Sequence, residues 1–509
     1  MPLIPLNIPA GQYRNGTEYQ SQGRWRDANL IRWHEGALRP VGGWRQRGSV
    51  DLDGVTRTMI AWEDNSGGRR VAFGTYNKLY VMTSGNAVSD ITPAGFTAGR
   101  VDATSFTSYG GGVYGSSLYG LPSEDIGTIF PATTWSLENW GEYLLGMTAD
   151  DGKIYEWQLD GGTPAAVLSN APVDCSGMMV TEERFVFAFG AGGNPRKIAW
   201  SDREDNNTWT PAATNEAGDI EIQTNGTILK GLRTRGQSLI LTDQDAHTAT
   251  YSGPPFVYGF ERVGTSCGLI AANAAASIDE GVVWMGQRSF FIYAGGSVRD
   301  LPCEVADYVF SDMNNDQRSK VHAVVNSRFN EIWWFYPSAT STECDSYVAF
   351  DYAENIWTTG TIDRTAGVDR GVFRQPFWIA ADGVLYEQEI GFDYGGQSPF
   401  AETGPIALGG ANKQRIKIMI IDCHGHYTTA PDPHQDYRAA QMARLQDPSL
   451  PEPQSAIISD DQIRESIELN QLKLLRERGA DMTIFSPRAS TMAHHVGDEQ
   501  VSQTWTAAC

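Results

Sequence analysis

The stretch GEYLLGMTADDGKIYEWQLDGG (141–162) decides the fold class of most of the chain. Its two short runs of apolar and polar residues are separated by the turn-forming residues ADDG, a pattern typical of antiparallel strands joined by a tight turn. The same pattern recurs in four further stretches: VAFGTYNKLYVMTSG (71–85), GVVWMGQRSFFIYAGGSV (281–298), residues 330–360, and FWIAADGVLYEQEIG (377–391). The first 410 residues are therefore expected to be mainly β.

A loose internal repeat refines this expectation. A Leu-Tyr or Ile-Tyr pair follows a polar turn at several places: Leu79-Tyr80, Leu118-Tyr119, Ile154-Tyr155, Ile292-Tyr293 and Leu385-Tyr386. Where the units are clearest they are roughly 40–60 residues apart, which suits the blades of a β-propeller. A large β-sandwich or an irregular β-domain is the alternative.

The net charge, the cysteine spacing and the lack of long apolar runs limit the classes of function. The 509 residues carry a net charge of −22, which argues against a protein that grips nucleic acid through its phosphates. The six cysteines show no CxxC spacing, which favours neither a disulfide framework nor a zinc knuckle. No leader-like start and no run of roughly 20 apolar residues is seen, so we expect neither export nor a membrane anchor.

The first part of the chain resembles a known family. The resemblance rests on GQYRNGTEYQSQGRWRDANLIRWHEGALRPVGGW (11–44), WSLENWGEYLLGMTADDGKIYEW (135–157) and RKIAWSDREDNNTW (196–209). These residues resemble the tail nozzle proteins, or packaged-DNA stabilisation proteins, of short-tailed bacteriophages. The resemblance implies a structural virion protein that forms a homo-hexameric ring below the portal and adaptor. The ring would retain and release the packaged genome, and DNA would pass through its lumen without sequence-specific binding.

The same resemblance implies other tail proteins as partners, no cofactor for the nozzle part, and a place in the virion tail after assembly in the host cytoplasm. An acidic lumen would repel phosphates, which agrees with DNA sliding past. We expect an N-terminal docking arm at residues 1–45 and a propeller-like nozzle domain at 46–404.

Arginine and tryptophan are concentrated in the expected arm. Both are typical anchors of protein interfaces, so the arm is expected to dock a neighbouring subunit. The alternative is nucleic-acid binding, because basic and aromatic residues alternate there. The predicted interface residues are Arg24, Trp25, Arg26, Arg32, Trp33 and Trp44.

The composition changes after a junction at residues 405–415. The run Ile418–Ile421 reads as a buried strand that stops at Asp422, just before His424 and His426. A long loop, an amphipathic helix at 459–479 capped by Ser459, and a second strand at 480–486 would follow. This order predicts a βαβ unit with parallel strands, in residues 416–509.

Residues 416–509 resemble the N-terminal part of an amidohydrolase-superfamily enzyme of the 4-oxalomesaconate hydratase family. The resemblance rests on IMIIDCHGHYTTAP, ISDDQIRESIELNQLKLLRERGADMTIFSPRASTMAHHVGD and WTAAC. It implies that His424 and His426 are metal ligands for zinc, and Arg488 is placed to meet a substrate carboxylate. His494 and His495 are either neighbours of that site or structural.

A complete (β/α)8 barrel needs about 250 residues, and its catalytic groups come from the ends of several strands. We therefore expect a truncated fragment without hydratase activity, joined to the propeller as a chimaera. Three functions compete: the structural virion protein, a metal-dependent hydratase with a long N-terminal extension, and a propeller that binds carbohydrate or another partner.

Overall fold

A computed structural model gives the fold of the chain, which forms two compact units. One unit comprises Met1–Asp393 and Glu402–Ile416, and the other comprises Tyr394–Ala401 and Lys417–Cys509. The residues that the structure describes are 7–105, 129–407, 413–414, 417–419, 422–426, 432–447, 449–453, 459–466, 468–469, 473 and 483–486.

The first unit contains seven four-stranded antiparallel sheets, which are the blades of a β-propeller. The expected β-propeller is thus confirmed, and the β-sandwich alternative is wrong. Blades 1 to 3 are β5–β8 (Thr58–Glu63, Arg69–Gly74, Leu79–Thr83, Val88–Asp90), β11–β14 (Trp135–Trp140, Tyr143–Thr148, Tyr155–Trp157, Ala166–Val167) and β15–β18 (Gly177–Val180, Val186–Phe189, Lys197–Trp200, Gly218–Glu221).

Blades 4 to 7 continue in chain order, except for the last strand of blade 7. Blades 4 to 6 are β19–β22 (Ile228–Thr234, Gln237–Thr242, Asp245–Gly253, Val257–Thr265), β23–β26 (Ala275–Ile278, Gly281–Met285, Phe290–Ala294, Ser297–Leu301) and β27–β30 (His322–Asn326, Glu331–Tyr336, Ser346–Asp351, Ile356–Thr361). Blade 7 consists of β31 (Ala366–Val368), β32 (Phe377–Ile379), β33 (Val384–Gln388) and β4 (Trp44–Ser49).

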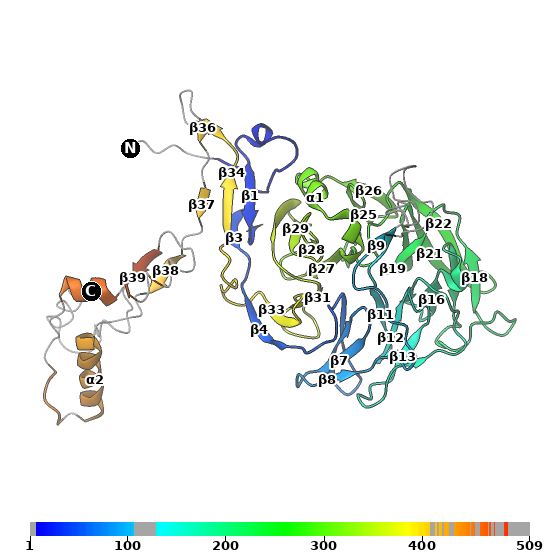
Figure 1. Cartoon of the computed structure of the whole chain (residues 1–509), viewed down its shortest axis with the longest axis horizontal. Coiled ribbons are helices and arrows are strands. Elements are labelled where there is room, and N and C mark those ends of the chain that lie inside the picture. The colour runs from blue at the N-terminus through cyan, green and yellow to red at the C-terminus, as the bar shows by residue number, and fades with distance from the viewer. Residues whose placement is uncertain are drawn as a thin grey trace, which may run out of the picture. The chain divides into compact units, whose positions relative to one another are not determined.

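The innermost strands of the blades make a closed ring, visible in Figure 1. In ring order they are β5, β11, β15, β19, β23, β27 and β31, each in contact with the next, and β31 returns to β5. Blade 7 is completed by β4 from the N-terminal part of the chain, which pairs antiparallel with β33 from Trp44↔Gln388 to Ser49↔Val384. The predicted boundary at residue 45 falls within this strand.

The hairpin that opens blade 2 shows how the sequence gives these sheets. β11 and β12 pair from Trp135↔Thr148 to Trp140↔Tyr143 around a two-residue loop. Gly141 is the first loop residue and has φ +64°, a conformation that glycine adopts without steric cost. Five of the six residues of β12 are buried, because neighbouring blades cover both faces of its sheet.

Aromatic side chains fill the space between blades. Trp284 of blade 5 and Trp334 of blade 6 are fully buried in one core cluster. Phe290 lies 4.7 Å from Trp357, measured between ring centroids, which joins the same two blades. Rings of this size bury 150–250 Å² each, so they supply much of the blade-to-blade stabilisation.

Short elements connect the blades and precede them. They are η1 (Glu18–Ser21), β1 (Trp25–Asn29), β2 (Ile31–His34), β3 (Ala37–Pro40), β9 (Thr104–Ser105), β10 (Ile129–Phe130), η2 (Ala191–Gly193), α1 (Ala306–Asp312), η3 (Asn315–Lys320), β34 (Phe400–Thr403), β35 (Ile406–Ala407) and β36 (Lys413–Gln414). Strands β2 and β3 form a hairpin whose two-residue loop, Glu35-Gly36, has positive φ at both positions. The repeat pair at Leu118-Tyr119 lies outside the described residues.

The second unit contains β37 (Lys417–Met419), β38 (Asp422–His426), α2 (Asp432–Gln446), α3 (Asp460–Ser466) and β39 (Thr483–Ser486). β38 and β39 pair parallel, as the sequence predicts. Ser459 caps α3: its Oγ accepts a hydrogen bond from the Gln462 N–H, and its own N–H donates to the Gln462 side chain. None of the described helices is long and apolar enough to cross a membrane.

Two expectations for this unit are wrong. Residues 432–446 were expected within a long loop, but they form α2, since Pro433 lies in its first turn and good helix formers follow. The strand expected over Ile418–Ile421 overlaps β37, but the expectation that the strand region stops at Asp422 is wrong, because Asp422–His426 form β38, which includes both histidines. Of the helix expected at 459–479, Asp460–Ser466 form α3, and most of residues 467–479 lie outside the described residues.

Candidate functional site

The predicted metal ligands lie in the second unit. His424 and His426 are two residues apart in β38, and His426 pairs with Ser486 of β39. Their side chains, and Arg488, His494 and His495 entirely, are outside the described residues. Catalytic zinc sites usually have three protein ligands, and the resemblance supplies two. This donor set alone does not make a catalytic zinc site, so zinc binding stays a prediction.

The predicted interface residues are held within their own chain. Trp25, Arg32 and Trp33 are buried, with exposed fractions of 6%, 4% and 3%. Arg24 forms an ion pair with Glu304 at 2.5 Å. Their intramolecular role was not expected from the sequence, whereas docking to a neighbouring subunit stays a prediction.

The other two predicted interface residues, Arg26 and Trp44, lie in β1 and β4. Trp44 is half-buried, and the guanidinium of Arg364 lies 5.0 Å from the centre of its ring. Further along the same N-terminal segment, Gln12 is fully buried, and its side-chain oxygen accepts hydrogen bonds from the N–H and the hydroxyl of Thr359. The segment is therefore fixed to blade 6 of its own propeller.

Arg32 is the centre of a buried ionic cluster, which we call the Arg32 triad: Arg32, Glu331 and Glu389. Arg32 Nε and Nη2 donate to the two carboxylate oxygens of Glu331 at 2.8 and 2.9 Å. Its Nη1 and Nη2 donate to Glu389 at 3.0 and 2.5 Å. The Phe329 ring lies 3.7 Å from the guanidinium carbon and covers its face. The triad joins the β2–β3 hairpin to blade 6 and to the end of β33.

Two carboxylates and one guanidinium leave the triad with one excess negative charge. Asn326 Nδ2 donates to both carboxylates, at 3.3 and 2.8 Å, and Trp333 Nε1 donates to Glu331 at 2.9 Å. Burial raises the pKa of Glu331 to about 7, and the charge of Glu389 adds to this rise while Arg32 opposes it. Burial alone would lower the pKa of Arg32, but the two glutamates raise it above its usual value.

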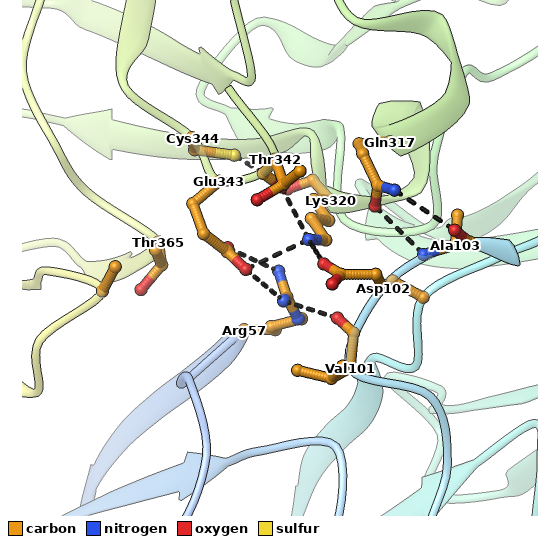
Figure 2. Close-up of polar contacts among 12 residues, drawn as sticks. Arg57, Val101, Asp102, Ala103, Gln317, Lys320, Thr342, Glu343, Cys344 and Thr365 are labelled. Carbon is orange, nitrogen blue, oxygen red and sulfur yellow. Dashed lines mark hydrogen bonds and ion pairs between the residues drawn. The ribbon is translucent and has the colours of Figure 1, made fainter. Parts of the chain in front are cut away.

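Figure 2 shows a second ionic cluster, in which two buried cations, Arg57 and Lys320, contact two partly exposed carboxylates. Lys320 is the last residue of η3, and its Nζ donates to Asp102, the Thr342 carbonyl and Glu343 at 2.5, 2.6 and 3.0 Å. An ammonium group has three donors, so this one is saturated. Arg57, which precedes β5, donates to both oxygens of Glu343. Two cations and two carboxylates balance, and the cluster connects blades 1 and 6.

Titratable groups beside this cluster are kept neutral. Burial raises the pKa of the Cys344 thiol far above its usual value. Burial lowers the pKa of His322 to about 4. A thiol and an imidazole that are both neutral at pH 7 are inert as a nucleophile and a proton carrier in this state, so this geometry favours a structural role.

A third group, which sequence reasoning missed, has ligand atoms close enough for a cation. The ligand atoms of His34, Asp351 and Glu354 all lie within 4.8 Å of one another. Asp351 also accepts hydrogen bonds from the N–H groups of Ala353 and Glu354, both at 2.9 Å, which builds the turn between β29 and β30. This turn accounts for the position of both acids without a metal ion.

Replacing Arg32 by methionine tests the triad. The Arg32→Met variant keeps most of the side-chain volume but leaves two buried carboxylates without a counter-charge. We expect it to lower the free energy of unfolding at pH 8 by about 3–5 kcal/mol. Arg39→Met is the matched control, because Arg39 is half exposed and 3.8 Å from Glu35; it should cost within about 0.5 kcal/mol. If Arg32→Met and Arg39→Met lowered the free energy of chemical unfolding equally, the stabilising role of the triad would be contradicted.

The raised pKa of Glu331 predicts a pH dependence. A carboxyl whose pKa is higher in the folded state than in the unfolded state favours folding at low pH, and this contribution is lost as the pH rises through the folded pKa. Between pH 5.5 and 8, the free energy of unfolding should fall by about 2 kcal/mol more for the wild type than for Glu331→Gln. Parallel pH profiles for the two proteins would show that Glu331 does not titrate in this range.

No protein-family model matches the chain. A segment of 94 residues, the length of 416–509, is 58% identical to 2-keto-4-carboxy-3-hexenedioate hydratase from Sphingobium sp. (strain NBRC 103272 / SYK-6), covering 18% of this chain and 27% of that protein. The crystal structure of 4-oxalomesaconate hydratase from Rhodopseudomonas palustris is 52% identical over 18% of this chain and 26% of its own, with a TM-score of 0.14. The chain thus spans about a quarter of the length of these hydratases.

The propeller has remote counterparts among solved structures. The virginiamycin B lyase from Staphylococcus aureus is 8% identical and covers 68% of this chain and 98% of its own, with a TM-score of 0.40. Such a likeness says nothing about activity. The comparisons therefore show that a small segment resembles a hydratase of the amidohydrolase family. They assign no function to the propeller.

Proposed function

We propose that the propeller is a structural module of a short phage tail, a subunit of a DNA-conducting nozzle ring that retains and releases the packaged genome. One observation carries the proposal. Residues 11–44, on which the resemblance to nozzle proteins rests most, are packed on the propeller itself, and β4 completes blade 7. The segment is thus a fixed part of the disc and presents a defined surface to a neighbour.

The net charge of −22 supports the same proposal. A lumen of negative charge repels DNA phosphates, so DNA passes without being held. The ionic clusters at Arg32 and Lys320 support it as well, because they join blades 1, 6 and 7 and so stabilise the propeller as one rigid module.

Assembly of the ring tests the proposal. The full-length chain should form particles of about six times its mass of 55.8 kDa, with six-fold symmetry by negative-stain microscopy. Tyr19 lies in η1 and is 68% exposed, so Tyr19→Ser should shift these particles toward monomers if the segment docks a neighbour. Phe256→Ser is the control, because this ring is 80% exposed on blade 4. Monomers at every concentration would contradict the proposal.

A hydratase is the second candidate, supported by the 58% identity of the 94-residue segment. In this candidate His424 and His426 would hold zinc, which would supply Lewis-acid or water-activating chemistry, and Arg488 would bind a substrate carboxylate. We expect no turnover of 2-keto-4-carboxy-3-hexenedioate, because barrel enzymes draw catalytic groups from several strands, and only one parallel strand pair is described in this unit. Turnover that is lost in His424→Ala would favour the hydratase.

A further inference from the structure

A pocket of about 430 Å³ lies where blade 7 meets blade 1. Arg45 and Arg47 of β4, Arg69 of β6 and Arg374 of the β31–β32 connection all line it. These arginines come from three separate segments, so only the closed propeller brings them together. Sequence analysis missed the pocket for that reason.

The charge of this pocket is opposite to that of the chain. Its lining contains four arginines and one carboxylate, Glu387, whereas the whole chain has 39 basic and 61 acidic residues. Glu63 pairs with Arg69 at 3.2 Å from outside the lining. Even with Glu63 included, two positive charges remain in excess. In an acidic protein such an excess favours an anionic ligand.

Existing contacts orient the guanidinium groups and leave donors for a ligand. Glu387 accepts from Arg45 Nε and Nη2 with one oxygen, at 3.2 and 2.5 Å, and from Arg47 Nη1 with the other, at 2.9 Å. Arg47 Nε donates to Asn86 at 3.0 Å. A guanidinium has five N–H donors, so both groups are held in place with donors to spare.

Among the four arginines, Arg374 has the least negative charge beside it. It is exposed, and within the described part of the chain no carboxylate forms an ion pair with it. Beside it, Phe373 and Phe377 are stacked with ring centroids 4.6 Å apart, and Arg47 lies 4.7 Å from the Phe377 ring centre. This apolar wall excludes water from one side of the pocket, which strengthens charge interactions there.

We propose that this pocket, which we call the Arg45–Arg374 pocket, binds the phosphate group of a small molecule. Forked guanidinium groups match the tetrahedral oxyanion of a phosphate ester, and its double charge matches the two excess positive charges. The volume is enough for a phosphate with a small organic group attached. This binding goes beyond the nozzle function and does not depend on it.

Isothermal titration calorimetry of the full-length protein tests the proposal. Sodium pyrophosphate and adenosine 5′-monophosphate are the probes, at low ionic strength and again at 0.5 M NaCl. We expect saturable binding that weakens at high salt, and at least tenfold weaker binding by the Arg45→Gln/Arg374→Gln double variant. Both side chains are exposed, so the double variant should keep the thermal transition of the wild type.

Arg299→Gln is the matched control, because Arg299 is an exposed arginine on β26, in another blade. It should bind both probes as the wild type does. Preference for adenosine 5′-monophosphate over pyrophosphate would identify a phosphate ester, and the reverse a free phosphate. The proposal is overturned if the wild type binds neither probe or if the double variant binds as well as the control. It is also overturned if only single-stranded DNA binds, since that would make the pocket part of a nucleic-acid surface.

Discussion

The pairing of β4 with β33 is the constraint on which the rest of the propeller depends. Seven blades form a ring only if the last blade is complete, and blade 7 takes its fourth strand from residues 44–49, more than 300 residues before its other strands. Without that pairing, β33 would present an open strand edge, and the contact between β31 and β5 would have to hold the ring alone. Bringing β4 to β33 costs conformational entropy, because a long stretch of chain must be closed into a loop. The contacts between all seven blades, which form together, offset this cost.

The charged clusters lie around this closure. The Arg32 triad fixes the segment before β4 to blade 6, the Lys320 cluster connects blades 6 and 1, and the Arg45–Arg374 pocket opens between blades 7 and 1. The first two are saturated by protein carboxylates, whereas the third keeps unbalanced positive charge. This contrast separates groups that stabilise the fold from groups that are available to a ligand.

Local features of the fold could be predicted from the sequence, and non-local ones could not. Alternation and turn residues indicated the hairpin within 141–162, because the pairing of β12 with β13 across a short turn is a local matter. The partner of β4 and the partners of Arg32, which are 299 and 357 residues away, could not be read from any window of sequence. Arginine and tryptophan at 24–44 predicted an interface with a neighbouring subunit, which stays a prediction, and the sequence did not indicate the contacts that these residues make within their own chain.

The described residues of the second unit form a parallel strand pair and two α-helices, unlike the antiparallel sheets of the propeller. Its likeness to hydratases rests on sequence identity over 94 residues. The proposed nozzle function of the propeller rests on the N-terminal segment that leads into the closing strand β4. The two units are therefore best tested separately. Closure of the propeller ring is the claim on which every argument about the first unit depends.

Amide hydrogen exchange of β4 in the full-length protein tests that claim most directly. If β4 closes the ring, peptides covering Trp44–Ser49 should be protected as strongly as peptides covering Val384–Gln388, and both should lose protection at the same denaturant concentration. Exchange of the β4 amides within seconds, while β33 stays protected, would mean that residues 44–49 belong to a free arm and that the ring is closed without them.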